Sequence, residues 1–189
     1  KNLNQKYPSK SIGIFLAGFD ENRDLFGQIK SSDELNVNKW YGSDGAALSS
    51  VILNDNTASE FAQKVTYPCP IFGLDSKASE KWLPLQSAIK NKSGINADAF
   101  TMCAYDGAWI CAMASLICGD TKDIAVIKTC ISKISESYYG ATGWCILNSA
   151  GDRKYGSFDY WIVKKDIDGK YGWSKLEVFD AVTGKIVGN

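Results

Sequence analysis

The stretch Ser11-Ile12-Gly13-Ile14-Phe15-Leu16-Ala17 is an apolar run bounded by polar residues. Such a run predicts a buried β-strand. Gly18-Phe19-Asp20 follows it, and residues 22–30 then carry apolar side chains at the spacing of one helix face: Leu25, Phe26 and Ile29. We therefore expect a strand and then a helix, which Asp20 or Asn22 caps.

A second strand is predicted at residues 38–41, before the turn Gly42-Ser43-Asp44-Gly45. A strand, a helix and a strand within about thirty residues form a βαβ unit, which implies a parallel sheet with a right-handed crossover. In open α/β sheets, the loops at the carboxyl ends of the strands bind ligands. Phe19 and Asp44 lie in these two loops, and we expect them at a ligand site.

The middle of the chain predicts a connector and then helices. Tyr67-Pro68-Cys69-Pro70 should be an extended connector, which we interpret as a lobe boundary. A helix is expected around Trp82, Leu85 and Ile89. The strongest helical pattern covers residues 99–117, with Asp98 as its cap, and a further helix covers residues 122–135. The short loop between the last two predicts antiparallel packing.

Strands are predicted again in the last part of the chain, at residues 145–147, 157–164 and 173–178. The helix stripes that contain Trp109 and Ile127 need a covering layer, because soluble monomers seldom expose large apolar patches. We expect these stripes to pack against each other and against the strands at 145–163, or to pair two chains as a homodimer.

Composition excludes several classes of function. The chain has 189 residues, 21 basic and 21 acidic side chains and no histidine. A net charge of zero argues against a nucleic-acid partner. Without histidine there is no imidazole for acid–base or nucleophilic catalysis, and most zinc sites are excluded. The longest uncharged stretch around the apolar centre, residues 107–119, is shorter than the about 20 residues that cross a bilayer.

Six cysteines leave two interpretations open: small buried apolar residues, or one or two disulfides of an extracytoplasmic protein. Cys111 and Cys118 are too far apart along one helix to form a disulfide with each other. If the two helices are antiparallel, Cys111 and Cys130 reach similar heights about the turn at 119–121. They are the expected pair if any disulfide forms.

Five local patterns occur in a fixed order along the chain: Ile14-Phe15-Leu16-Ala17-Gly18-Phe19, Trp40-Tyr41-Gly42-Ser43-Asp44-Gly45, Asp98-Ala99-Phe100 through Ala104-Tyr105-Asp106-Gly107-Ala108-Trp109, Gly143-Trp144-Cys145-Ile146-Leu147-Asn148-Ser149-Ala150-Gly151-Asp152-Arg153, and residues 173–187 with Phe179-Asp180-Ala181-Val182-Thr183-Gly184-Lys185. Together they resemble the type I periplasmic binding proteins of the leucine/isoleucine/valine-binding kind. The resemblance extends over nearly the whole chain but covers only the later half of the family pattern.

The resemblance implies an α/β fold of the periplasmic-binding-protein type I, in which parallel sheets are flanked by helices. In the family, two lobes are joined by three crossings, and ligand closes the hinge between them. Carried over, residues 1–67 and 160–189 belong to one lobe, and residues 71–158 form part of the other. The missing first half would supply most of the amino-terminal lobe and the groups that hold a ligand carboxylate.

Four candidate ligand contacts follow from the resemblance: Asp44, Phe19, Tyr41 and Asp20. The family places an acid at the position of Asp44, where it pairs with the ammonium group of a bound amino acid. Alternatively, Asp44 is a turn residue that bonds its own backbone. Phe19 either covers apolar ligand surface or packs over the following helix. Tyr105 is expected in the core.

The resemblance implies an extracytoplasmic solute-binding protein, periplasmic or at the cell surface, with an ABC transporter permease as its partner and no cofactor or metal. Two other functions remain open: the ligand-sensing ectodomain of a receptor, and a truncated domain that binds no small molecule. We expect no enzyme, because no nucleophile–base pair can be assembled. The neighbouring carboxylates Asp20-Glu21 and Asp33-Glu34 are interpreted as solvated loop charges.

Overall fold

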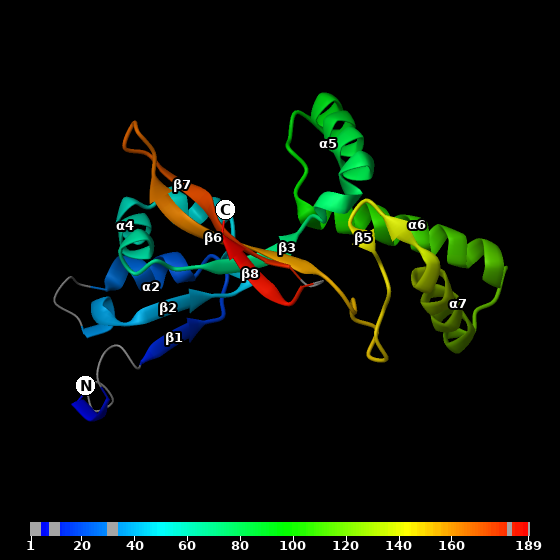
Figure 1. The fold of residues 1–189 in the computed structure, drawn as a ribbon, viewed down its shortest axis with the longest axis horizontal. Coiled ribbons are helices and arrows are strands. Elements are labelled where there is room, and N and C mark those ends of the chain that lie inside the picture. Colours follow the sequence, from blue (N-terminus) through cyan, green and yellow to red (C-terminus); the bar gives the residue numbers. More distant parts are fainter. Residues whose placement is uncertain (1–4, 8–11, 30–33, 181–182, 189) are drawn as a thin grey trace. The chain divides into compact units, whose positions relative to one another are not determined.

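The computed structural model describes residues 5–7, 12–29, 34–180 and 183–188. The chain divides into two compact units, each described by itself (Figure 1). Unit 1 contains residues 1–71, 158–179 and 185–189, and unit 2 contains residues 72–157 and 180–184. That unit 1 and unit 2 are lobes in the binding-protein sense, with the bounds expected above, stays a prediction.

Unit 1 begins with the predicted βαβ unit. Its elements are β1 (Gly13–Leu16), α2 (Asn22–Gln28) and β2 (Lys39–Gly42). The two strands pair in parallel, with Gly13 opposite Lys39 and Leu16 opposite Gly42. The expected parallel pairing is therefore confirmed. The helix cap is different from the prediction, because Glu21 occupies the cap position and makes no capping bond with its side chain.

Two helices that the sequence pattern did not reveal complete this part of unit 1: α3 (Ser50–Leu53) and α4 (Asn56–Lys64). Ser49 caps α3, and Asp55 caps α4 with its carboxylate on the amide of Ala58. Figure 1 shows α2 and α4 on the same side of the β1–β2 pair. Only one face of the pair is covered, since Phe15 on the other face is 69% exposed.

The core of unit 1 is a cluster of aromatic rings under this covered face. The ring of Phe26 from α2 packs edge-on against Trp40 of β2 and Tyr67, with centroids 5.9 and 5.0 Å apart. Phe61 of α4 contacts both Phe26 and Trp40. All four side chains are buried. Helix and strand are therefore fixed to each other by the interlocking of large rings.

A four-stranded sheet follows in the order β3-β6-β7-β8. Its strands are β3 (Cys69–Gly73), β6 (Ser157–Lys165), β7 (Tyr171–Asp180) and β8 (Lys185–Gly188). The connector expected at 67–70 is thus partly a paired strand, and β3 lies at the sheet edge, where a proline is tolerated. β6 and β7 are antiparallel, and Trp173 of β7 donates its indole N–H to the carbonyl of Ser49 at 3.0 Å.

Unit 2 consists mainly of helices: α5 (Ser79–Ser93), α6 (Ala99–Cys118) and α7 (Ile124–Ser137). Asp98 caps α6 as predicted, through the amide of Thr101 at 2.8 Å. β4 (Tyr139–Gly140) and β5 (Gly143–Trp144) form a small antiparallel pair. The strand expected at 145–147 is wrong, since only Leu147 forms a bridge there, to Arg153.

The apolar stripes of α6 and α7 are only partly covered. The two helices pack on each other, but Trp109 of α6 remains half exposed, and Leu116 and Ile124 are also exposed. Tyr105 is exposed as well, so its expected place in the core is wrong; its ring contacts Trp109 instead. Helix α6 therefore presents an apolar surface along much of its length.

By length and composition, α6 is able to cross a membrane, contrary to the conclusion from the uncharged stretch at 107–119. However, Asp106 lies in the middle of this helix, is buried, and accepts hydrogen bonds from Ala141 and Thr142 of unit 2. We interpret α6 as a packed helix of unit 2, because this carboxylate ties it to a polar loop.

The disulfide joins Cys118 to Cys130, with 6.4 Å between their Cα atoms. The expected pair of Cys111 and Cys130 is therefore wrong. The prediction assumed that residues equally far from the turn at 119–121 lie at the same height along the two helices. However, α7 begins only at Ile124. The longer connection places the last residue of α6 beside the second turn of α7. Cys111 is free and exposed, whereas Cys69 and Cys145 are free and buried.

Removing a buried aromatic ring should destabilise unit 1 much more than removing an exposed ring. We expect Phe26→Ala to lower the free energy of unfolding by about 3–5 kcal/mol, because it leaves a cavity between α2, α4 and β2. Phe15→Ala, on the uncovered face of β1, is the matched control and should change stability by about 0.5 kcal/mol or less. Urea titrations followed by circular dichroism measure both, and equal losses would contradict this description of the core.

Peptide mapping without reduction should recover the link between Cys118 and Cys130, with Cys111 open to alkylation. Cys130→Ser should cost about 2–3 kcal/mol, since the disulfide closes a short loop. Cys111→Ser makes the same substitution at a free cysteine of α6 and should leave the free energy of unfolding almost unchanged. A map that links Cys111 to Cys130 would show that α6 and α7 are aligned as the sequence had suggested.

Candidate functional site

The carboxyl ends of β1 and β2 bring two loops together in unit 1. Because Leu16 is paired with Gly42, the segments 18–20 and 43–45 leave the sheet at the same edge. The hydroxyl of Ser43 accepts a hydrogen bond from the amide of Gly18 and donates to its carbonyl, each at 3.3 Å. One serine thus fastens the two loops to each other.

Two further groups hold the base of this site. Tyr67 donates its hydroxyl to the carbonyl of Leu16 at 3.3 Å and accepts from the amide of the Asn22 side chain at 3.2 Å. Burial raises the pKa of the Tyr67 phenol well above its usual value and that of the Cys69 thiol to about 12. Both groups are therefore neutral at physiological pH and act as structural supports.

Phe19 lies against Gly45, at the closest approach of the two loops. A Cβ on Gly45 would lie 2.8 Å from two ring carbons of Phe19 and 2.9 Å from the carbonyl oxygen of Gly18. The ring is 68% exposed, so it forms an open wall. The Phe19 amide donates to Glu21 Oε1 at 3.0 Å, and this bond lowers the pKa of the Glu21 carboxyl.

Asp44 is exposed beside this wall. Its Oδ1 accepts a hydrogen bond from the amide of Gly45 at 2.9 Å, which is the turn interaction weighed as the alternative role. Its Oδ2 makes no hydrogen bond to any part of the chain that the structure describes. One carboxylate oxygen therefore stabilises the turn, and the other is open to a donor from a ligand.

The remaining two candidates are placed less favourably. Asp20 accepts a hydrogen bond from the hydroxyl of Ser49 at 2.8 Å and so fixes the loop before α3. Tyr41 is half exposed on the uncovered face of β2, and its Cε2 atom would lie 3.3 Å from a Cβ on Gly13. Since Gly13 begins β1, the ring of Tyr41 leans away from the strand ends. The structure brings Phe19 and Asp44 together and leaves Tyr41 apart.

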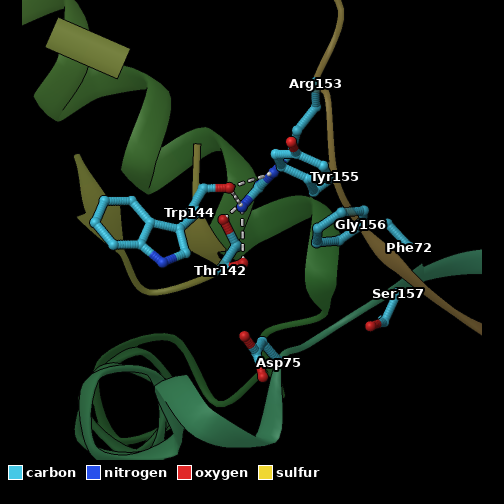
Figure 2. Close-up of a pocket in the computed structure, with 9 residues that line it drawn as sticks. Phe72, Asp75, Thr142, Trp144, Arg153, Tyr155, Gly156 and Ser157 are labelled. Carbon is cyan, nitrogen blue, oxygen red and sulfur yellow. Dashed lines mark hydrogen bonds between the residues drawn. The ribbon is translucent and has the colours of Figure 1, made fainter. Parts of the chain in front are cut away.

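Unit 2 contains a pocket of its own, with a volume of about 340 Å³ (Figure 2). Aromatic side chains of Phe72, Trp144 and Tyr155 form its walls. Asp75 lies on one side, and Arg153 and Thr142 lie on the other (Figure 2). No sequence pattern predicted this pocket, because its residues come from three separate segments that only folding brings together.

Arg153 is held in place by main-chain oxygens. Its guanidinium donates to the carbonyls of Thr142 and Trp144 at 2.7 and 2.8 Å and to the Thr142 hydroxyl at 2.6 Å. It also stacks over the ring of Phe72, 4.8 Å from the centroid. Within the described part of the chain, no carboxylate pairs with it directly.

Behind Arg153, the buried carboxylate of Asp106 organises the loop at 141–145. It accepts from the amides of Ala141 and Thr142, both at 2.8 Å, and from the Thr142 hydroxyl at 2.5 Å. Burial raises the pKa of the nearby Cys145 thiol. Asp106 and Arg153 both lie in the motifs of the family resemblance. The Thr142 hydroxyl links them, since it donates to Asp106 and accepts from Arg153, and this link was not predicted from the sequence.

Among the described residues, no group of cysteine, aspartate and glutamate side chains is arranged to hold a metal ion. The side chains of the two sites offer hydrogen bonding, charge pairing and contact with aromatic rings.

Solved structures with the same arrangement of elements are substrate-binding proteins. The chain is similar to a leucine-binding protein of Thermotoga maritima, with a TM-score of 0.56 and 18% identity, over 93% of this chain and 44% of that one. A substrate-binding protein of an ABC transporter from Desulfitobacterium hafniense has a TM-score of 0.56 at 15% identity, over 92% of this chain and 47% of that one. The chain has a periplasmic-binding-protein-like fold.

In sequence, the chain is 28% identical to an uncharacterized protein of Methanocaldococcus jannaschii, over 92% of this chain and 42% of that protein. No profile of a known protein family matches the chain. The chain thus spans less than half the length of the relatives it matches.

Because the two loops approach each other closely at Gly45, adding one methyl group there should destabilise the protein. Gly45→Ala should lower the free energy of unfolding by about 1–3 kcal/mol, because the new Cβ meets the Gly18 carbonyl and the Phe19 ring. Gly107→Ala is the matched control: nothing lies near it in α6, and the same change should raise stability by about 0.5–1 kcal/mol. If both variants unfold at the same denaturant concentration, the loops are further apart than described.

Proposed function

We propose that the chain is part of an extracytoplasmic solute-binding protein that delivers an amino acid or a similar small molecule to an ABC transporter. The observation that carries this proposal is the joint position of Phe19 and Asp44 at the carboxyl ends of two parallel strands. This is the place where open α/β sheets bind ligands. The fold that the chain shares with substrate-binding proteins supports it.

Each group of the site has a role in this proposal. The open Oδ2 of Asp44 accepts a hydrogen bond from the ligand ammonium, which needs a charged acceptor once it leaves water. The exposed ring of Phe19 covers the apolar part of the ligand. Because the main-chain amide of Gly45 keeps Oδ1 occupied, the carboxylate is held in one orientation before ligand arrives. Asp20 and Tyr41 support the loops and the sheet face.

Other features agree with this role. A ligand that is only bound and released needs no catalytic base, and the chain contains no histidine. A disulfide between Cys118 and Cys130 is typical of proteins outside the cytoplasm. The permease partner is inferred only from structural relatives. These include a substrate-binding protein of an ABC transporter from Desulfitobacterium hafniense in complex with leucine, 14% identical over 92% of this chain.

Binding should depend on Asp44 more than on any other carboxylate of unit 1. We expect Asp44→Ala to weaken leucine binding by about 2–5 kcal/mol where the rest of the fold is supplied, because the ammonium loses its charged partner. In the 189-residue chain, binding should be weak, with amide shifts near Phe19 and Gly45 in titrations followed by nuclear magnetic resonance.

Asp24→Ala is the matched control for this experiment. Asp24 is an exposed carboxylate of α2 in the same unit, and it pairs with Arg23. Its removal should leave leucine affinity unchanged. Equal affinity of the Asp44→Ala variant and the unaltered protein would reduce Asp44 to a turn residue.

A further inference from the structure

The pocket of unit 2 has the composition of a ligand site rather than of a packing defect. Its volume of about 340 Å³ is within the range of small-molecule pockets. Apolar surface dominates its walls, and a carboxylate and a guanidinium are placed at different sides of it. Opposite charges that face one cavity without touching are what a molecule with two charged ends requires.

Asp75 is held so that one of its oxygens is available. Its Oδ1 accepts the amide of Lys77 at 2.9 Å, and its carbonyl accepts the indole N–H of Trp82 at 3.0 Å. Its Oδ2 makes no hydrogen bond within the described part of the chain. A Cβ on Gly143 would lie 3.1 Å from Oδ2, so the glycine lets the carboxylate approach the loop.

The opposite side of the pocket is equally rigid. Four hydrogen bonds to Thr142 and Trp144 fix the Arg153 side chain, and its plane stacks on Phe72. Although no carboxylate touches it, its charge remains and favours an anionic group nearby. Trp144 is half exposed and packs edge-on against Tyr139, so its ring is available as a wall.

From this arrangement we infer that the unit 2 pocket binds a small zwitterion with an apolar body, its ammonium on Asp75 and its anionic end toward Arg153. The apolar part lies against Phe72 and Trp144. This site is separate from the strand-end site of unit 1 and is built wholly from residues of unit 2.

Three probes of similar size separate the contributions of the two ends: L-phenylalanine, phenethylamine, which lacks the carboxylate, and 3-phenylpropionate, which lacks the ammonium. The readout is the shift of the Trp144 indole signal in ¹⁵N-labelled 189-residue protein, assigned with Trp144→Phe. We expect L-phenylalanine to bind most tightly, phenethylamine next and 3-phenylpropionate most weakly.

Asp75→Asn is the decisive variant, because its amide oxygen can still accept the bond from Lys77 and keep the turn. It should weaken L-phenylalanine and phenethylamine by about tenfold or more and leave 3-phenylpropionate unchanged. Asp44→Asn should change none of the three at Trp144, so a failure of the strand-end site is distinguished from a failure of this one. The inference is overturned if Asp75→Asn binds all three as before, or if no probe moves the Trp144 signal up to its solubility limit.

Discussion

The parallel pairing of β1 with β2 is the interaction on which the candidate site depends. Its register places Leu16 opposite Gly42, and only then do the loops of Phe19 and Asp44 meet. Backbone hydrogen bonds between two short strands are too few to fix a parallel pair in water. The aromatic cluster of Phe26, Trp40 and Phe61 supplies the remaining stability, because it packs α2 and α4 together onto the one covered face of the pair.

The carboxylates of the two units differ in how far they are buried and in what they bind. In unit 1, the Asp44 carboxylate is exposed and uses one oxygen for its turn, so the ligand role proposed for it needs a wall from elsewhere in the fold. In unit 2, the buried carboxylate of Asp106 accepts hydrogen bonds from main-chain amides. It therefore shapes the loop that holds Arg153. Burial thus separates the structural carboxylate from those that can meet a ligand.

Sequence patterns predicted the elements with clear apolar segments, such as β1, α2 and α6, and their order in an α/β fold. They missed α3, which is a single turn capped by Ser49, and α4, whose buried face contains one large apolar side chain, Phe61, beside the small Ala58 and Ala62. The disulfide partner of Cys130 depended on the length of the loop after α6, which periodicity does not give. The strand-end loops could be placed from topology alone, whereas the unit 2 pocket joins segments that no local pattern connects.

We propose that the ends of β1 and β2 form a ligand-binding wall. A crystal structure of the 189-residue protein grown with saturating leucine tests it most directly, since a high concentration compensates for weak affinity. We expect leucine at this edge, with its ammonium within hydrogen-bond distance of Asp44 Oδ2 and its side chain against the ring of Phe19. Leucine that binds only elsewhere, with the strand ends occupied by solvent, would contradict it.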